Sequence, residues 1–447
     1  MNRTVLVDDS SLETRIAMLE DQRLAELRVI DRDALIPGAV YRGRVERVDR
    51  SLNAAFVDIG EHLPGFLPDA GQVHQGDALL VQLDAVPVTR TKGVRLTRKI
   101  LLNSPSLVLL PGQSGIRLSK KIKKQREAAV RRTGEAICPE GCGLIMRSLW
   151  QNGDVPGAGE EAGTLFATWQ NIETAFLKSS TPGLVYAEPR LVRHFCEPYL
   201  SVPNTMVYVN SRESFDQLSG LQNVTLFEEQ SSLLFDVYQV EKQIDRALQN
   251  RIWLKSGGYL TVDYCEAFTI YDVNSGKDDR KKAPEEKAYL IDCEAIEAIL
   301  NHIRLCNIGG IILADLIDLP DGARQEELLH LARTKAGQDT QKVSVEGITS
   351  LGILQLTRKR TGLPLREIYY EPCHCCESGM QVRAFVLRDK IRREIERRIL
   401  SGSHSGYEIT CHRDVQAEIK MDPFFETIEF RLKDTGGRRN EYSVKAI

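Results

Sequence analysis

The sequence GGYLTVDYCEAFTIYDVNSGK (257–277) is followed, after an intervening segment, by GGIILADLIDLP (309–320). Each half is rich in β-branched and apolar residues, opens with a Gly-Gly pair and closes on turn residues, so each half predicts a strand. Each also carries a carboxylate where a buried strand should have none. Asp272 stands before Val-Asn-Ser-Gly at the exit of its strand, and Asp315 interrupts the apolar run from Ile311 to Leu319.

These two aspartates are candidate metal ligands. An isolated ionised carboxylate in an apolar run is strongly unfavourable unless it is paired or binds a metal. Ligands that are all oxygen favour a hard ion such as Mg²⁺ or Mn²⁺. Two other interpretations stay open: Asp272 could cap the turn that follows it, and Asp315 could pair with a nearby basic residue. Asp318, three positions after Asp315, is a weaker candidate.

The bulk composition is that of an ordinary globular chain, with 447 residues, 42% hydrophobic and 27% charged. This length suggests about three domains. No run of 18 or more apolar residues occurs and the N-terminus lacks the apolar core of a signal peptide, so we expect no transmembrane segment and a cytoplasmic location. Ten cysteines are present, seven of them scattered singly, and no disulfide framework is expected.

The formal net charge of −3 is unevenly distributed. Residues 117–132 hold eight Lys or Arg against one Glu. Such a run fits a solvated helix face, and beside an RNA-binding fold it also fits a track for phosphates.

The first hundred residues predict mainly short strands. Residues 2–8 and 26–31 read as strands around a helical segment, LETRIAMLEDQRLA (12–25). Five further strands with Gly-bearing turns between residues 41 and 102 predict a small barrel of the OB type. Such a barrel stacks bases on aromatic side chains ringed by basic ones. Phe56 and Phe66 are the aromatic candidates, although Phe56 could also be core, and the basic candidates are Arg42, Arg44, Lys92 and Arg95.

The rest of the chain alternates helix and strand patterns up to residue 250 and contains a strand that ends at Arg147-Ser148. After the two aspartates comes CHCC at 373–376, in which Cys373 and Cys376 form a Cys-x-x-Cys pair. This pair is either a redox pair or half of a tetrahedral zinc site that another molecule completes. Residues 383–402 predict a charged amphipathic helix, and residues 405–447 read as strands.

Taken together, these segments resemble the ribonuclease E/G family, in order, from the first strand to about residue 380. The resemblance implies a multidomain α+β fold without a long C-terminal scaffold. Its expected parts are an N-terminal part of a ribonuclease-H-like domain (1–35), an OB-fold RNA-binding domain (36–118), a 5′-phosphate sensor region (119–185), the remainder of the ribonuclease-H-like domain (186–250), a catalytic DNase-I-like domain (251–370), a zinc-link (371–380) and a small C-terminal domain (381–447).

The same resemblance implies a Mg²⁺-dependent endoribonuclease that cleaves single-stranded RNA, leaves a 5′-phosphate and a 3′-hydroxyl, and responds to a 5′-monophosphate. Asp272 and Asp315 would bind the ion and Asn274 would orient the site. Arg147 and Ser148, where the family has Arg-Thr, would grip the 5′-phosphate. Cys373 and Cys376 would bind a Zn²⁺ shared by two protomers, giving dimers that pair into tetramers, with His374 and Cys375 as departures from the family pattern. The expected RNA contacts are Phe56, Phe66, Lys92, Lys277, Lys342 and Arg358.

Two alternatives come from other functional classes. The chain could be a catalytically silent RNA-binding protein that keeps the fold, or a zinc-bridged assembly protein. The intact set of Asp272, Asn274 and Asp315 favours the nuclease.

Overall fold

The structure is a computed structural model of the whole chain. It describes residues 2–31 (backbone only at 31), 35–85, 93–187, 192–193, 196, 199, 204–218, 221, 223–229, 231–276, 283–319, 321–373, 379–402, 406–437 and 439–447. The chain forms two compact units, one of residues 34–189 and one of residues 1–33 with 190–447.

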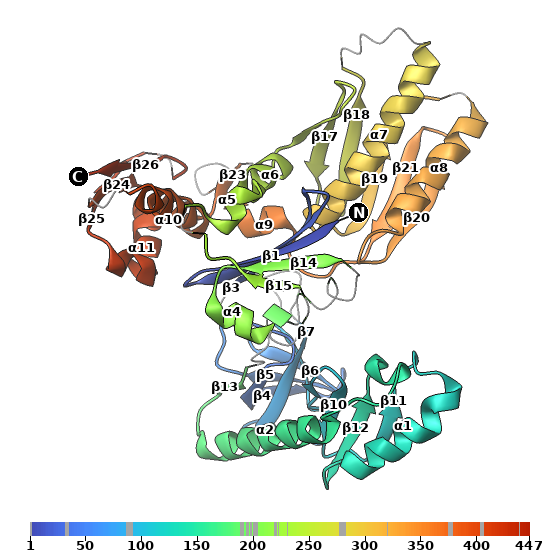
Figure 1. Ribbon diagram of the computed structural model, residues 1–447, viewed down its shortest axis with the longest axis vertical. Helices are drawn as coiled ribbons and strands as arrows, with labels where there is room; N and C mark the ends of the chain where they lie inside the picture. Colours follow the sequence, from blue (N-terminus) through green and yellow to red (C-terminus); the bar gives the residue numbers. More distant parts are fainter. Residues whose placement is uncertain are drawn as a thin grey trace. The chain divides into compact units, whose positions relative to one another are not determined.

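The smaller unit begins with a closed five-stranded β-barrel, shown in light blue in Figure 1. Its strands follow the order β4–β5–β6–β8–β7, and β7 pairs back onto β4. Apolar side chains such as Val45, Val57 and Val81 fill the interior. This closed barrel of short strands is consistent with the expected OB-like fold. The bounds are β4 (Val40–Asp49), β5 (Ala54–Asp58), β6 (Gly65–Pro68), β7 (Ala78–Ala85) and β8 (Arg95–Thr97).

A second sheet in the same unit has the order β11–β12–β10–β9. The helix α2 packs against β10, and α1 packs against β11 and β12. Trp150 is fully buried in this layer and donates a hydrogen bond to the Ser106 carbonyl at 3.2 Å. The elements are β9 (Leu102–Asn103), β10 (Leu107–Pro111), β11 (Gly115–Leu118), α1 (Lys124–Ile137), β12 (Cys142–Met146), η1 (Ser148–Gln151), α2 (Ala158–Lys178) and β13 (Gly183–Tyr186), the last pairing with β4.

The larger unit opens with a five-stranded sheet of order β15–β14–β1–β2–β3. The prediction of a helix at residues 12–25 is wrong, because this segment forms β2 and the start of β3. Nearly every residue of β2 is buried, so the segment lacks the alternation typical of a half-buried strand, and its Leu, Met, Ala, Arg and Glu residues favour helix by propensity. Asp21 and Gln22, both at positive φ, make the two-residue hairpin turn. The elements are β1 (Arg3–Asp9), β2 (Glu13–Glu20), β3 (Arg23–Asp31), β14 (Thr205–Val209), α4 (Arg212–Gln217) and β15 (Val224–Leu226).

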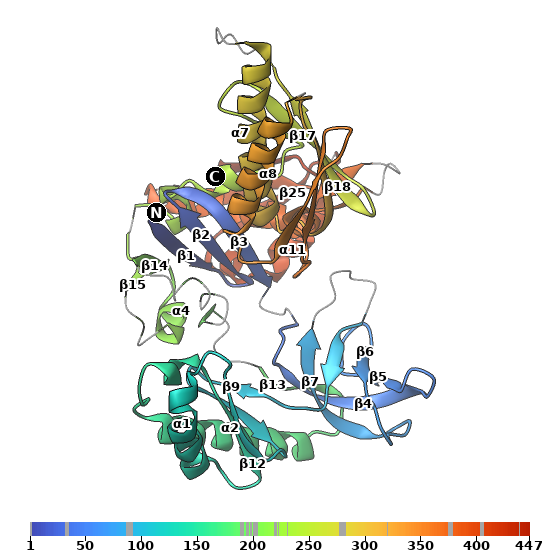
Figure 2. The ribbon, with the colours of Figure 1, turned by 90° about the vertical axis from the view of Figure 1, so that its right-hand side faces the viewer.

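A six-stranded sheet of order β16–β17–β18–β19–β21–β20 contains both aspartate-bearing stretches. The first stretch, expected as one strand, folds as an antiparallel hairpin of β17 and β18, and β19 lies parallel to β18 after a crossover through α7. The helices α7 and α8 lie side by side (Figures 1 and 2). The elements are α5 (Leu234–Val237), α6 (Val240–Ala247), β16 (Arg251–Trp253), β17 (Tyr259–Tyr264), β18 (Phe268–Asn274), α7 (Pro284–Leu305), β19 (Gly310–Asp315), α8 (Gly322–Ala336), β20 (Val343–Ile348), β21 (Ile353–Arg358) and α9 (Leu365–Tyr369).

The alternation of side chains decides which face of this sheet is covered. Tyr271, Ile312 and Ala314 are buried in the core that α7 and α8 share with the sheet. Asp272 and Asp315 point to the opposite face and are exposed. This face is called the open face below.

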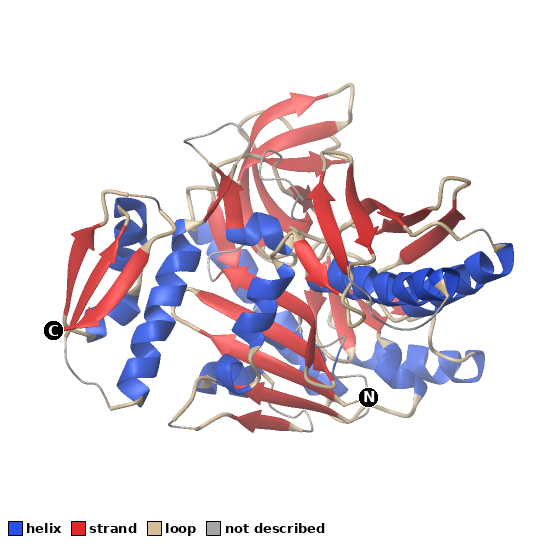
Figure 3. Ribbon diagram, turned by 90° about the horizontal axis from the view of Figure 1, so that it is seen from above, coloured by secondary structure: helices blue, strands red, loops and turns tan. Residues whose placement is uncertain are grey.

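The C-terminal part contains a small sheet of order β25–β24–β26 beside α10 and α11 (Figure 3). The expectation of strands throughout 405–447 is partly wrong, because residues 413–421 form α11. Val415 and Ile419 there are buried at a spacing of four, which is helical, and His412 caps the helix through its ring nitrogen. The elements are β22 (Tyr370–Pro372), β23 (Met380–Val382), α10 (Ala384–Leu400), β24 (Tyr407–Cys411), α11 (Arg413–Met421), η2 (Pro423–Thr427), β25 (Phe430–Asp434) and β26 (Tyr442–Ala446).

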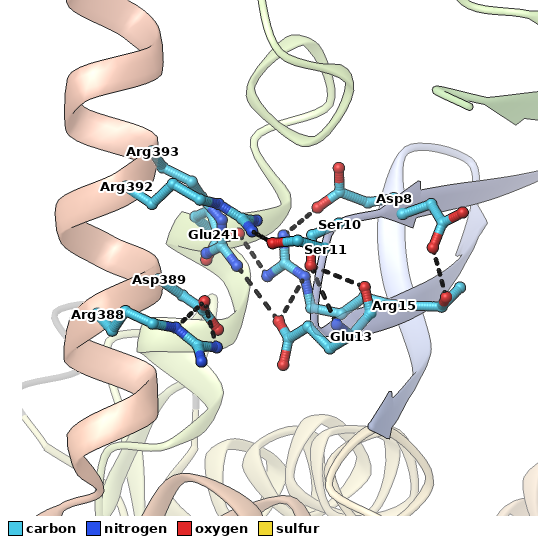
Figure 4. A network of polar contacts seen from close by, with 12 residues as sticks. Asp8, Ser10, Ser11, Glu13, Arg15, Glu241, Arg388, Asp389, Arg392 and Arg393 are labelled. Atoms are coloured by element: carbon cyan, nitrogen blue, oxygen red, sulfur yellow. Dashed lines mark hydrogen bonds and ion pairs between the residues drawn. The ribbon is translucent and has the colours of Figure 1, made fainter. Parts of the chain in front are cut away.

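Several charged residues of α10 are buried in a network with β1, β2 and α6 (Figure 4). Glu241 Oε1 forms ion pairs with Arg15 Nη1 at 2.7 Å and with Arg393 Nη1 at 2.6 Å, and Arg15 also pairs with Asp8. Burial alone would raise the pKa of Glu241, but the two guanidinium groups lower it to about 2. Charge pairing therefore holds α10 to the N-terminal strands β1 and β2. Among the described residues, no helix combines the length and apolar character needed to cross a membrane.

Candidate active site

Asp272 and Asp315 lie directly opposite each other on the parallel strands β18 and β19. Neighbouring strands are about 4.8 Å apart, and paired residues project from the same face of a sheet. Both carboxylates therefore stand side by side on the open face. Sequence reasoning predicted that folding would bring these two residues together, and the register does so.

Two neighbouring side chains contact Asp272. Asn274 Nδ2 donates to Asp272 Oδ2 at 2.7 Å, and Thr261 Oγ1 donates to the same oxygen at 3.3 Å. Both bonds hold the same carboxylate oxygen, Oδ2. Within the described part of the chain, no basic side chain pairs with Asp315. The turn that follows Asp272 contacts its carboxylate through the side chain of Asn274 and not through a backbone N–H.

The donor set fits a hard divalent ion. Two adjacent carboxylates on an open face supply negative charge and oxygen ligands, and Mg²⁺ keeps several of its own waters when proteins bind it through one or two carboxylates. In the described residues, no three His, Cys, Asp or Glu side chains form an all-protein cage for a metal. Any ion held here would complete its shell with water or substrate oxygens.

Asp292 on α7 supports the segment that follows Asp315. It is fully buried and accepts a hydrogen bond from the backbone N–H of Ile317 at 3.0 Å. Burial, together with the nearby charge of Asp318, raises the pKa of Asp292 to about 7. Asp318 itself is exposed. Sequence reasoning missed Asp292, although a carboxylate among Ile291, Ala295 and Ile296 on the apolar side of a helix was a usable signal.

Tyr271 and His302 lie beneath Asp272 on the covered face. The Tyr271 hydroxyl is 2.7 Å from His302 Nδ1, and His302 Nε2 is 2.9 Å from the Ala247 carbonyl oxygen. Since a carbonyl only accepts, Nε2 carries the proton and Nδ1 accepts the bond from Tyr271. Burial lowers the pKa of His302 to about 4, so the ring is neutral at pH 7. This chain of hydrogen bonds anchors β18 from below, and sequence reasoning did not find it.

The basic residues expected to contact RNA have different surroundings. Lys342 is exposed just before β20. Arg358 is buried, 1% exposed, and pairs with Asp339 at 2.8 Å, so the structure does not support its expected contact with RNA. Thr357, not Arg358, shares the face of Asp315, because side chains alternate along β21. Lys277 and Lys92 lie outside the described residues.

In the barrel, Phe56 and Phe66 form a cross-strand pair. Their ring centroids are 5.9 Å apart in an edge-to-face arrangement, and both rings are half-buried. The guanidinium carbon of Arg47, which sequence reasoning did not single out, lies 4.4 Å from the Phe56 centroid. Of the expected cations, Arg42 instead donates to the Phe176 carbonyl at 2.8 Å and stacks on its ring. Arg95 pairs with Asp84 at 3.1 Å.

The two remaining candidate sites are described in part. Arg147 follows β12 and is half-buried, with Nη1 donating to the Ser104 carbonyl at 2.7 Å, and Ser148 opens η1. Cys373 follows β22, and its N–H donates to the Gly379 carbonyl at 2.8 Å across the hairpin. His374, Cys375 and Cys376 lie outside the described residues.

The chain resembles known proteins over most of its length. The model of the Ribonuclease E/G family matches residues 102–361, which include Arg147, Asp272 and Asp315. The chain belongs to this family. Ribonuclease G of Escherichia coli (strain K12) is 30% identical over 96% of this chain and 99% of its own length.

Two further relatives differ in how much of their own length this chain covers. Ribonuclease G of Haemophilus influenzae is 30% identical over 90% of this chain and 87% of its own length. Ribonuclease E of Buchnera aphidicola is 27% identical over 86% of this chain but only 43% of its own length. The resemblance inferred from the sequence is confirmed.

Proposed function

We propose that this protein is an endoribonuclease that cleaves single-stranded RNA in RNA processing and decay, leaving a 5′-phosphate and a 3′-hydroxyl. The observation that carries the proposal is the register of Asp272 opposite Asp315 on an open sheet face, in a chain of the ribonuclease E/G family. A long polymer cannot enter an enclosed pocket, whereas an open face beside a carboxylate pair can accept a phosphodiester anywhere along a strand.

Asp272 and Asp315 would hold one Mg²⁺ or Mn²⁺. When bound, such an ion supplies Lewis-acid polarisation of a phosphoryl oxygen and charge neutralisation at the scissile phosphate. Asn274 holds Asp272 Oδ2 at 2.7 Å, which fixes the direction of that carboxylate before the ion binds. The buried bonds of Tyr271 and of Asp292 keep β18 and the segment after β19 in register.

RNA binding is proposed for several other sites. Bases would stack on Phe56 and Phe66, beside Arg47, in the barrel. Lys342, Lys92 and Lys277 would neutralise backbone phosphates. Arg147 and Ser148 would recognise a 5′-monophosphate, with Arg147 already oriented by the Ser104 carbonyl.

The assembly and the domain assignments are also proposals. The Cys373 and Cys376 thiolates of two copies would share one Zn²⁺, which would link dimers able to pair into tetramers. The hairpin of β22 and β23 supports this assignment, because Cys373 comes directly after β22, at the end of the hairpin where its two strands are connected. The N-terminal five-stranded sheet would be the ribonuclease-H-like part and the six-stranded sheet with α7 and α8 the DNase-I-like part.

The test compares 5′-monophosphorylated and 5′-hydroxyl oligoribonucleotides with a fluorophore and quencher, over a titration of Mg²⁺. We expect Asp315→Asn to lower kcat/KM by at least about 100-fold, since transition-state electrostatics carry most of such a rate. The matched control is Asp263→Asn, an exposed aspartate on β17 outside the carboxylate pair, which retains most of the activity. Binding of RNA by the wild type without cleavage would identify a silent RNA-binding protein. Cleavage that survives Asp315→Asn would reject the site.

A further inference from the structure

An aromatic pair, of which Trp253 is exposed and Tyr259 half-buried, lies on the hairpin of β16 and β17. Trp253 is 64% exposed and stands opposite Tyr259, with the ring centroids 5.4 Å apart. The guanidinium carbon of Arg251 lies 4.4 Å from the Tyr259 centroid and 5.8 Å from that of Trp253. Tryptophan carries the largest apolar surface of any side chain, so its exposure beside a second aromatic ring and a cation calls for a ligand.

The register places this pair on the open face, next to the carboxylates. Tyr259 pairs with Asn274, and Thr261, two residues along β17, pairs with Asp272. Leu260 and Val262, which alternate with them, are buried under the helices. With strands about 4.8 Å apart and a rise of about 3.4 Å per residue, the Cα of Tyr259 is roughly 8 Å from that of Asp272, and the Cα of Trp253 roughly 12 Å.

A flat aromatic surface with an adjacent guanidinium suits an unpaired nucleobase. Every base has a π-face that stacks on Trp or Tyr, and Arg adds cation–π attraction and a contact for phosphate. The barrel has the same combination, in which Arg47 lies over Phe56 in the cross-strand pair with Phe66. The polar groups of Thr261, Asn274 and Asp272 directly beside the rings fit a nucleotide better than the apolar core of a protein interface.

We propose that Trp253, Tyr259 and Arg251 form a base-stacking subsite that holds an unpaired nucleotide close to the scissile phosphodiester. The inference rests on the proposed cleavage at Asp272 and Asp315 and adds a second point of attachment on the catalytic sheet itself. Stacking of a base at this subsite would fix the position of the RNA strand relative to the carboxylates. It also selects for single strands, because both faces of a base in a duplex are already stacked.

The experiment is an abasic scan. A single-stranded oligoribonucleotide with one cleavage site is prepared in a series, each member with one base removed near that site. We expect one position at which the missing base raises KM by about fivefold to 100-fold with the wild type. With Trp253→Ala the intact oligonucleotide already shows this higher KM, and removing the same base has no further effect. Trp253→Phe restores most of the dependence on that base.

The controls separate this inference from the proposed function. Leu351→Ala removes another exposed apolar side chain, 74% exposed, from the β20–β21 turn and should keep the wild-type profile. Near wild-type kcat at saturating RNA shows that Trp253→Ala is folded. If cleavage requires Asp315 but Trp253→Ala gives the wild-type abasic profile, the stacking subsite is rejected and the proposed function stands. If Trp253→Ala instead changes the oligomeric state in light scattering and leaves the abasic profile unchanged, the face binds a second copy, which also overturns the proposal.

Discussion

Lowering the pH should destabilise the six-stranded sheet of β16 to β21 through His302. The folded protein keeps this ring neutral down to a pKa of about 4, because the ring is buried, whereas in the unfolded chain the ring has its ordinary pKa of 6.5. Between these values the unfolded state binds the additional proton, so the free energy of unfolding decreases as the pH falls from 6.5 to 4. At about 1.4 kcal/mol for each tenfold difference in proton affinity, the loss is about 3 kcal/mol.

Substitution of the ring isolates this contribution from those of other titrating groups. His302→Asn cannot titrate, and its amide oxygen can still accept the bond from Tyr271. It should be less stable than the wild type at pH 7, because the Ala247 carbonyl loses its donor, and the difference should shrink by about 3 kcal/mol on going to pH 4. Hydrogen exchange of β18 and α7 peptides, corrected for intrinsic rates at each pH, measures the local opening free energy. Tyr271→Phe keeps the buried imidazole and serves as the control that retains the wild-type slope. Equal slopes for the wild type and His302→Asn would refute the assignment of a neutral buried ring.

Two further predictions concern the same sheet. Arg358→Ala should lower the free energy of unfolding by about 3–5 kcal/mol, because it leaves Asp339 as an unpaired buried charge. In the same denaturant titration, Lys342→Ala should stay within about 0.5 kcal/mol of the wild type. An Arg358→Ala protein of wild-type stability would contradict the buried pair. Gly258→Ala would place a Cβ 2.7 Å from the Asn274 carbonyl oxygen. Because this clash displaces Asn274 from Asp272, the substitution should lower kcat/KM for an oligoribonucleotide, whereas Gly163→Ala on α2, where a Cβ meets open space, should leave it unchanged. Unchanged kcat/KM in Gly258→Ala would show that Asn274 tolerates the shift.

The carboxylate pair could be predicted from the sequence because Asp272 and Asp315 break apolar strand patterns, and a broken pattern is visible in one chain. The barrel could also be predicted, since its strands are short and its turns carry Gly and Asn. The helix wrongly expected at residues 12–25 shows the limit of pattern reasoning, because β2 is buried on both faces and therefore has no alternation. Arg358 shows a second limit. Whether a cation meets solvent or a buried carboxylate depends on tertiary packing around Asp339, which no local pattern encodes.

The topology explains why the two aspartates meet at the same level. In an antiparallel pair, a residue near the exit of one strand faces a residue near the entry of its partner. The strands β18 and β19 are parallel, joined by the crossover helix α7, so their carboxyl ends lie at one edge of the sheet, and Asp315, the last residue of β19, faces Asp272 near the end of β18. Sites in open α/β sheets gather at the carboxyl ends of parallel strands for this reason. The antiparallel hairpin of β16 and β17 then extends the same face sideways, which brings Trp253 and Tyr259 to the carboxylates without requiring any loop to fold over them. The parallel pair thus sets where the two carboxylates stand, and the antiparallel extension places the aromatic pair on the same face.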